Sequence, residues 1–470
     1  MSIEIRADYT KQFLLPPSLE EWIPNDHPAR FIRDFVDSLD LAGLGFRIPE
    51  ASEGRPPYSA DLQLKVWLYG YLEKIRSSRG LEKACYNQLP LIWLTGRNYP
   101  DHNTLWRFFK NNKKALRRIF RQIVGVAYDS GLIGLVVHAV DGTKIRACSS
   151  NRSGHHRNEL ETLLQELDAF IDEAMGEIES AEVSESGAYR LPKKLADAEV
   201  RRAQIKRSLA KLSEIDHDHY HPGESDTRMM KMVEGVNFGY NAQAVVDSQS
   251  SLIVAEEVTN SGSDNDQLVE MVEKAEENVG GTASETVADG GYYSPGQLAE
   301  AEERGYGVLV PILDRSSRQG RFHRSHFKYD ESRDEYICPE GHCLKYVRTY
   351  RDRRQRHQIR VYRCQSFKDC PHRRQCSSHK RGRTLHRGEH DAAVSRQREK
   401  QKSVSKQEIL TWRKWIVEPV FAHIKEHMNF RRWTMRNLEN VRTQWSMICI
   451  IYNLKKLYRH WLEGTIILTR

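Results

Sequence analysis

The stretch Gly134-Leu-Val-Val-His-Ala-Val-Asp141-Gly-Thr-Lys-Ile-Arg146 decides the fold class of this chain. Its apolar, β-branched residues predict a buried strand, and Asp141 stands at the polar end of the apolar run. A second stretch, Thr286-Val-Ala-Asp289-Gly-Gly-Tyr-Tyr293, likewise carries an aspartate from an apolar strand into a glycine turn. Because helices are predicted between the strands, the pattern indicates a mixed α/β domain.

Further elements of this domain can be predicted between and after the two aspartates. Residues 241–247 and 252–258 read as a β-hairpin, residues 268–275 and 297–303 as helices, and residues 308–313 as another strand. Residues 158–220 differ, because their leucines recur at helical spacing on both sides of Pro192. This pattern predicts an antiparallel helical hairpin inserted into the domain.

The N-terminal region, up to about residue 125, has the apolar periodicity of short helices. Asp101 is the expected N-cap of one of them, whose polar side carries Asn103, Arg107 and Lys110. Short helices joined by tight turns fit a helix-turn-helix-like DNA reader, in which these three side chains would contact DNA. A plain helical bundle with a solvated polar face fits the same pattern.

The charge of the chain is concentrated in one segment. The net charge is +8, but residues 341–400 hold 18 Lys and Arg against 5 Asp and Glu, a net of +13. The rest of the chain therefore carries −5. Such a segment suits a polyanionic partner, and we expect Arg351, Arg353 and Arg354 to contact DNA phosphates.

Five of the eight cysteines lie in or beside this basic segment. In a reducing compartment, clustered cysteines more often bind metal than form disulfides. A structural zinc needs four ligands, and the set that we favour is Cys338, Cys364, Cys370 and Cys376, with Cys343 or His342 as substitutes. Free thiols in a basic loop are the alternative.

Composition also bears on location. The N-terminal residues MSIEIRADYT lack the apolar core of a signal peptide, and no run approaches the ~18 apolar residues of a spanning helix. We therefore expect a soluble cytoplasmic protein without a membrane partner.

A third carboxylate stands far downstream, on the predicted helix that contains Lys414-Trp-Ile-Val-Glu418-Pro-Val-Phe-Ala-His-Ile-Lys425. Hard divalent cations prefer oxygen ligands, and two such ions about 3.5–4 Å apart can stabilise both oxygens of an in-line phosphoryl transfer. On a continuous helix Lys414, Glu418 and Lys425 would share a face. Pro419 disfavours helical geometry at Glu418, so we expect a kink or a new helix start there.

These three motifs, in this order, resemble those of the DDE transposases of bacterial insertion sequences. Val137-His-Ala-Val-Asp141-Gly-Thr-Lys144 is similar to the first-strand motif of that family, and Ala288-Asp289-Gly-Gly-Tyr292 to its second. The third motif is a glutamate followed, after six residues, by Lys425. Thr411 and Lys414 stand where the family often has tyrosine and arginine.

The resemblance implies an RNase H-like catalytic core, in which Asp141, Asp289 and Glu418 hold two Mg²⁺ (or Mn²⁺) ions and Lys425 steadies the phosphate. It further implies that Lys414 and Arg413 contact DNA beside the site, and that double-stranded transposon ends and target DNA are bound by a dimer or a larger oligomer. The expected function is cleavage of transposon ends followed by strand transfer. The alternatives are a nuclease of the same fold that does not join strands, and a non-catalytic DNA-binding relative.

The expected division of the chain follows from these patterns. It comprises a helical DNA-binding domain (1–125), the first part of the core (126–157), a helical-hairpin insertion (158–220), the second part of the core (221–318), a basic Cys-rich insertion (319–404) and C-terminal helices with the catalytic glutamate (405–470).

Overall fold

The computed structural model describes most of the chain. The described residues are 18–47, 56–151, 154–180, 193–215, 218–312, 322–351 and 358–466. Among them, no helix is both long enough and apolar enough to cross a bilayer.

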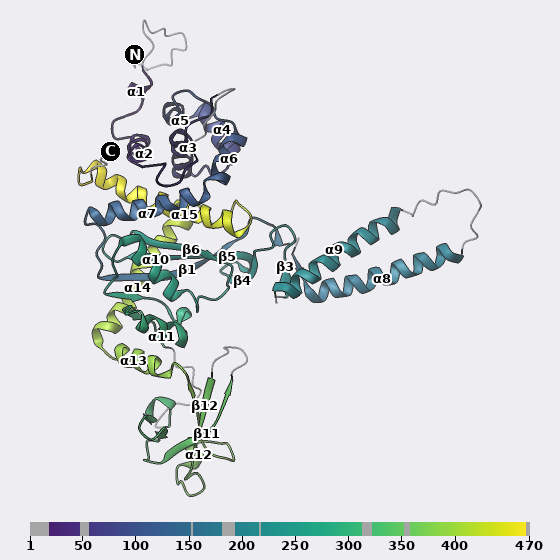
Figure 1. Cartoon of the computed structure of the whole chain (residues 1–470), viewed down its shortest axis with the longest axis vertical. Helices are drawn as coiled ribbons and strands as arrows, with labels where there is room; N and C mark the ends of the chain where they lie inside the picture. Colours follow the sequence, from purple (N-terminus) through teal and green to yellow (C-terminus); the bar gives the residue numbers. More distant parts are fainter. Residues whose placement is uncertain are drawn as a thin grey trace, which may run out of the picture.

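A six-stranded mixed sheet forms the centre of the molecule (Figure 1). Its strands are β1 (Val137–Arg146), β4 (Arg228–Met232), β5 (Gly235–Asp247), β6 (Ile253–Thr259), β7 (Glu285–Val287) and β8 (Val308–Leu309). β5 pairs antiparallel with β1, β4 and β6, whereas β1, β7 and β8 run parallel. The predicted hairpin and the two aspartate-bearing strands are confirmed, and the mixed α/β architecture is consistent with an RNase H-like core.

Helices enclose this sheet. They are α7 (Lys113–Asp129), α10 (Leu268–Val279), α11 (Pro295–Glu303), α13 (Asp391–Gln401), α14 (Val404–Ala422) and α15 (Leu438–Leu462). α15 and α10 pack on β6, α7 packs on α15, and α14 packs against β1 and β5. Asn453 in α15 bonds both the N–H and the C=O of Ile253, which fixes the helix to the edge of the sheet.

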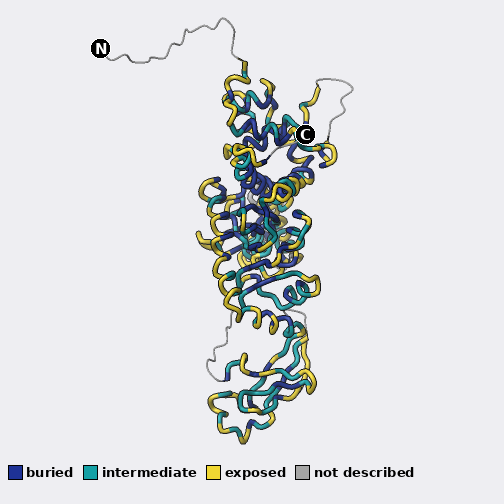
Figure 2. Tube along the Cα trace, turned by 90° about the vertical axis from the view of Figure 1, so that its left-hand side faces the viewer, coloured by how far each residue is buried: buried dark blue, intermediate teal, exposed yellow. Residues whose placement is uncertain are grey.

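The N-terminal helices share the core of the sheet domain. They are α1 (Leu19–Trp22), α2 (Pro28–Asp37), α3 (Ala60–Leu72), α4 (Ser78–Asn87), α5 (Leu89–Leu94) and α6 (His102–Asn111). Asp101 caps α6 as predicted, since its carboxylate accepts from the N–H groups of Asn103 and Thr104. One hydrophobic cluster runs from these helices through the sheet to α15, and Figure 2 shows the buried residues concentrated there.

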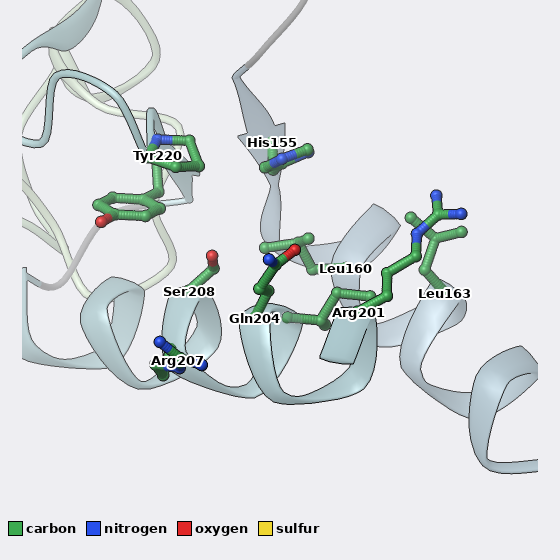
Figure 3. A pocket seen from close by; sticks show the side chains of 10 residues that line it. His155, Leu160, Leu163, Arg201, Gln204, Arg207, Ser208 and Tyr220 are labelled. Carbon is green, nitrogen blue, oxygen red and sulfur yellow. The ribbon is translucent and has the colours of Figure 1, made fainter. Parts of the chain in front are cut away.

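The predicted helical hairpin projects from the main body as an arm (Figure 1). It consists of α8 (Arg157–Ser180) and α9 (Lys193–Ile215), and the short strands β2 (His155–His156) and β3 (His219–Tyr220) pair at its base. Leu160 packs with Leu212, and Ile171 packs with Leu195, so the helices are antiparallel. A cavity of about 520 Å³ lies at the base of the arm, among His155, Gln204 and Tyr220 (Figure 3).

The basic Cys-rich segment contains a second sheet, which the sequence reading did not predict. It is antiparallel and five-stranded, and its strands are β9 (Lys328–Asp330), β10 (Glu335–Ile337), β11 (Cys343–Arg351), β12 (Gln358–Cys364) and β13 (Thr384–Gly388); a short helix, α12 (Arg373–Cys376), accompanies them. Tyr336, Leu344, Tyr362 and Leu385 form its small core. The alternative of a basic loop is therefore wrong for the described part of this segment.

Candidate active site

The sheet brings Asp141 and Asp289 together. β1 and β7 are parallel neighbours, and Ala139 pairs with Val287. Asp141 and Asp289 each lie two residues beyond this pair: Asp141 is in the middle of β1, and Asp289 follows the end of β7. Since side chains alternate along a strand, Asp141 shares the face of Ala139. Two positions that are 148 residues apart in the chain thus become neighbours through strand pairing.

Asp141 is held on both of its carboxylate oxygens. Nη1 of Arg413 in α14 lies 3.0 Å from Oδ2, and the N–H of Gly142 donates to Oδ1 over 2.8 Å. Burial raises the pKa of Asp141, and the nearby Asp289 carboxylate adds to this effect. The charge of Arg413 and the Gly142 bond oppose the rise. The site thus concentrates negative charge and balances part of it with one guanidinium.

Asp289 ends the strand and begins a 3₁₀ turn, Gly290–Tyr292. Its Oδ1 accepts from the N–H of Gly291 over 2.7 Å, and a Cβ at Gly291 would lie only 2.8 Å from that oxygen. A side chain at this position would therefore displace the carboxylate. The glycine turn after Asp289 fixes the carboxylate and keeps the space beside it open.

The structure adds Asp264, which the sequence reading missed. Its Oδ1 accepts from Nδ2 of Asn241 over 2.6 Å and from Nε2 of Gln243 over 2.7 Å. Gln243 also accepts from the hydroxyl of buried Tyr292. Burial raises the pKa of Tyr292 well above its ordinary value, and the charges of Asp264, Asp141 and Asp289 raise it further. The carboxylates of three aspartates therefore lie near the hydroxyl group of Tyr292.

The signal for Asp264 was weak. It lies in Ser261-Gly-Ser-Asp264-Asn-Asp, between β6 and α10, and such a stretch reads as an ordinary polar turn. Asn241 and Gln243 are both 0% exposed inside β5, which is unusual for amides in a sheet core. Two amides spaced two residues apart lie on the same face of a strand, and buried amides need hydrogen-bond partners. They therefore indicate a polar side chain opposite them, which is Asp264.

Glu418 lies on α14, and its side chain is exposed. The buried side of this helix holds Arg413, Ile416, Val417, Val420 and Phe421. Among the described residues, no hydrogen bond links Glu418 to either Asp141 or Asp289. The structure thus places the third predicted carboxylate on a helix that packs against β1, while Arg413 of that helix contacts Asp141.

Of the two outcomes expected at Pro419, a new helix start is wrong, because α14 continues through this proline to Ala422. A proline removes one backbone N–H donor, but Val417 and Val420 are buried and anchor the helix on both sides of the loss. The irregularity follows one turn later, as the π-helical turn His423–His427. Lys414 and Glu418 are therefore one turn apart on a continuous helix, and both are exposed.

Lys425 lies in that π-helical turn and is partly buried. Burial and the charge of Arg431 lower its pKa, whereas the charge of Asp141 opposes the change. Lys425 is thus electrostatically coupled to Asp141, as a phosphate-steadying residue would need to be.

The other predicted DNA contacts fall into two groups. Asn103, Arg107 and Lys110 are exposed on one side of α6, opposite the buried Leu105, Phe108 and Phe109. Arg351 is exposed at the end of β11, and Arg353 and Arg354 lie outside the described residues. Arg413 differs from its prediction as a DNA contact, because it is 7% exposed and paired with Asp141.

Four cysteines of the second sheet lie within electrostatic range of one another, although among the described residues no three His, Cys, Asp or Glu side chains are grouped as a metal site. Burial raises the pKa of Cys364, and the charges of Cys338, Cys370 and Cys376 raise it further. The N–H groups of Glu340 and His342 point at the sulfur of Cys338, at 3.4 and 3.3 Å. Cys343 behaves differently, since a hydrogen bond to Glu335 is the largest cause of its raised pKa.

The donor chemistry of the aspartate site fits a hard divalent cation. Asp141, Asp264 and Asp289 supply only oxygen, and Oδ1 of the fully buried Asn241 has no hydrogen-bond partner. Among the described residues, no three His, Cys, Asp or Glu side chains lie close enough together to form a preformed metal site. The arrangement is a cluster of oxygen donors partly neutralised by Arg413.

Two family models match the chain. Residues 337–458 match a transposase DDE domain, and residues 17–111 match a transposase domain (DUF772). The first match contains the cysteine cluster, Arg413, Glu418 and Lys425; the second contains α1 to α6. No curated protein matches the chain.

Proposed function

The chain belongs to the DDE transposases of insertion sequences, as its two family matches show, and from this premise we propose that it cuts transposon ends and joins them to target DNA. The observation that carries the proposal is the pairing of β1 with β7, which places Asp141 beside Asp289 in a mixed sheet. Oxygen donors clustered on neighbouring strands suit phosphoryl transfer on a nucleic acid. The strand directions support an RNase H-like core.

The residues of the chain have distinct roles in this proposal. Asp141, Asp289 and Glu418 would hold Mg²⁺ or Mn²⁺, with Asp264 as an additional carboxylate. When bound, the cations neutralise charge on the scissile phosphate and lower the pKa of a coordinated water. Arg413 orients Asp141 through its 3.0 Å contact. Lys425, coupled to Asp141, binds a phosphate oxygen and fixes the DNA strand for in-line attack.

The reaction has two balanced steps. In the first, a water oxygen attacks phosphorus at the transposon end, the 3′ oxygen leaves, and the water loses a proton. In the second, the freed 3′-hydroxyl attacks a phosphodiester of target DNA, and the 3′ oxygen of that strand leaves. Each step breaks one P–O bond and forms another, so no oxidant or energy source is needed.

Double-stranded DNA would be held by several surfaces. The exposed side of α6 supplies Asn103, Arg107 and Lys110 for a helix-turn-helix-like contact. Lys414 on α14 and Arg351 on β11 add positive charge for the phosphate backbone. Since two transposon ends must be joined to one target, the active form would be at least a homodimer, acting in the cytoplasm on the nucleoid.

A structural zinc would hold the second sheet together. The four favoured ligands, Cys338, Cys364, Cys370 and Cys376, influence one another electrostatically, and thiolate ligands typically accept backbone N–H groups as Cys338 does. A sheet with so small a hydrophobic core gains much of its folding stability from a bound metal.

Strand transfer by purified protein tests the proposed function. The substrate is labelled duplex from the DNA that flanks the coding region, incubated with plasmid and Mg²⁺. We expect labelled plasmid products with the wild type and none with Asp289→Asn. Asp266→Asn is the matched control, because Asp266 is an exposed aspartate near the site. Cleavage without joining would favour the nuclease alternative, and DNA binding without cleavage would favour the non-catalytic one.

A further inference from the structure

A cavity separate from the aspartate site lies between the N-terminal and C-terminal helices. Its volume is about 630 Å³, within the ~300–1,000 Å³ that ligand sites typically have. α2 contributes Phe31 and Ile32, α3 contributes Leu72, and α15 contributes Tyr452 and Tyr458. These side chains form an apolar wall, so the cavity can hold more than a hydrated ion.

Four cationic or ionisable nitrogen side chains line the same cavity. They are His423 from the π-helical turn, and Lys455, Lys456 and Arg459, which lie within five residues of one another in α15. Among the described lining residues, Glu73 alone is acidic. Lys455, Lys456 and Arg459 form no salt bridge with any described residue, and Nζ of Lys456 donates to the carbonyl of Ser250 over 3.0 Å.

The positive side chains in and around the cavity lower one another's pKa values. Burial lowers the pKa of Lys455, and Lys74 and Arg76 lower it further, with Glu73 opposing. Burial and Arg459 lower the pKa of Lys456. The pKa of His423 falls through burial and through Lys455, His427, Lys456 and Arg459. Partly buried cations that repel one another cost free energy unless an anion relieves them.

We propose that this cavity binds a phosphate group of a DNA strand, with Lys455, Lys456 and Arg459 on the phosphate and the apolar wall against the attached sugar. The site rests on the proposed function, because it takes its ligand from the DNA that a transposase must hold. α14 connects the two sites: Val420 and His423, at and just beyond its end, face the cavity, and Arg413 contacts Asp141. DNA bound in the cavity would therefore contact the same helix, α14, that carries Glu418.

The test compares two double variants with the same loss of charge. Lys455→Gln/Arg459→Gln removes two cations of the cavity, whereas Lys206→Gln/Arg207→Gln removes two exposed cations from α9 on the arm. Affinity for a labelled 30-base-pair duplex is measured by fluorescence anisotropy over a salt series. We expect the cavity variant to bind about tenfold more weakly at low salt, with a log–log salt slope smaller by about one. The control variant should retain the wild-type salt slope and most of the affinity.

A second measurement distinguishes DNA from free phosphate as the source. The melting temperature of each protein is recorded with inorganic phosphate and with chloride at equal ionic strength. We expect phosphate to stabilise the wild type more than chloride does, and this difference to vanish in the cavity variant. A circular dichroism spectrum of each variant establishes that it is folded.

The outcomes separate the two proposals. Equal loss of duplex affinity in both variants would overturn the inference, because the effect would then be general attraction. Unchanged duplex affinity in the cavity variant, with loss of phosphate stabilisation, would mean a site for free phosphate and also overturn it. If Asp289→Asn retains strand transfer while the cavity variant binds duplex weakly, the catalytic assignment fails and the cavity site stands.

Discussion

Arg413 and the aspartates show how single residues set the chemistry of the site. Asp141, Asp264 and Asp289 would repel one another, and Arg413 offsets part of that repulsion through Asp141. The Arg413 guanidinium contacts Oδ2 of Asp141, and a bound cation would coordinate the same oxygen. Because each carboxylate oxygen has two lone pairs, Oδ2 can keep this contact while a cation binds, and the contact makes Arg413 a positioning residue for Asp141.

Asp264 can be tested without an activity assay. We expect Asp264→Asn to raise the melting temperature of the metal-free protein by a few degrees, because one of three repelling carboxylates becomes neutral. The same variant should gain less stability from Mn²⁺ than the wild type does, since one donor is weaker. Asp266→Asn is the control, and an equal Mn²⁺ shift in Asp264→Asn and the wild type would contradict the role of Asp264.

Glu256 predicts a pH dependence of stability. It lies on β6, and its Oε1 accepts from the hydroxyl of Ser446 in α15 over 2.5 Å. Burial, reinforced by Glu257, raises its pKa to about 7. Because the folded-state pKa lies above the unfolded value, the contribution to stability is full below about pH 4.5 and is lost as pH rises through 7.

We therefore expect Glu256→Gln to remove this loss. Denaturant unfolding at pH 5.5 and pH 8.5 should show the wild type losing on the order of 1–3 kcal/mol more than the variant over that range. Parallel pH profiles of the two proteins would show that Glu256 ionises freely in the folded state.

At the residue scale, the sequence predicted positions that carry a local signature. Asp141 and Asp289 end apolar runs and Asp101 precedes a helical pattern; the structure has Asp141 in the middle of β1, Asp289 just after β7 and Asp101 at the N-cap of α6. Asp264 and the contact of Arg413 with Asp141 were not predicted, because both depend on which strands, turns and helices pack together. The Arg413–Asp141 pair spans 272 residues, and no periodicity encodes such a contact.

The elements differ in how closely sequence determines them. The sequence predicts the α8–α9 arm because leucines at helical spacing are a strong signal. It predicts the β5–β6 hairpin because the alternation of side chains along a strand is also a strong signal. The β9–β13 sheet was not predicted, because its longest strands, β11 and β12, carry arginine and tyrosine where apolar residues are usual. Its aromatic side chains stack with arginines instead, as Arg360 does over Tyr346.

The arm should be separable from the rest of the fold. Its hydrophobic clusters are distinct from the main core, and Arg157 and Asp218 close its base through a 2.8 Å backbone hydrogen bond. We expect replacement of residues 158–217 by Asn-Gly, which suits a tight hairpin turn, to shift the melting temperature by only a few degrees. Loss of the cooperative unfolding transition would mean that the arm supports the core.

At the scale of the whole molecule, the cysteine cluster and the central sheet form separate hydrophobic units. We expect purified protein to contain about one zinc per chain, and a chelator to unfold the β9–β13 sheet while the main body stays folded. Calorimetry of the chelated protein should then keep the transition of the main body with a smaller total unfolding enthalpy, and metal analysis should show the loss of zinc.

The matched variants for zinc come from the same segment. Cys370→Ser/Cys376→Ser should abolish zinc binding, whereas Cys343→Ser should retain it, because Cys343 interacts with Glu335. Low zinc in the wild type, unchanged in both variants, would be incompatible with a structural zinc site.

The position of α15 has a consequence for how the protein is made. Residues 438–462 pack on β6 and α7 and lie in the same buried cluster as the N-terminal helices. A ribosome releases these residues after Asp141, Asp264 and Asp289, so the sheet emerges with its β6 surface uncovered. The nascent chain would then hold its strands in an unfinished state until α15 has been made. The order of translation itself would delay completion of the sheet, and of the aspartate site that it carries, until α15 can pack on β6.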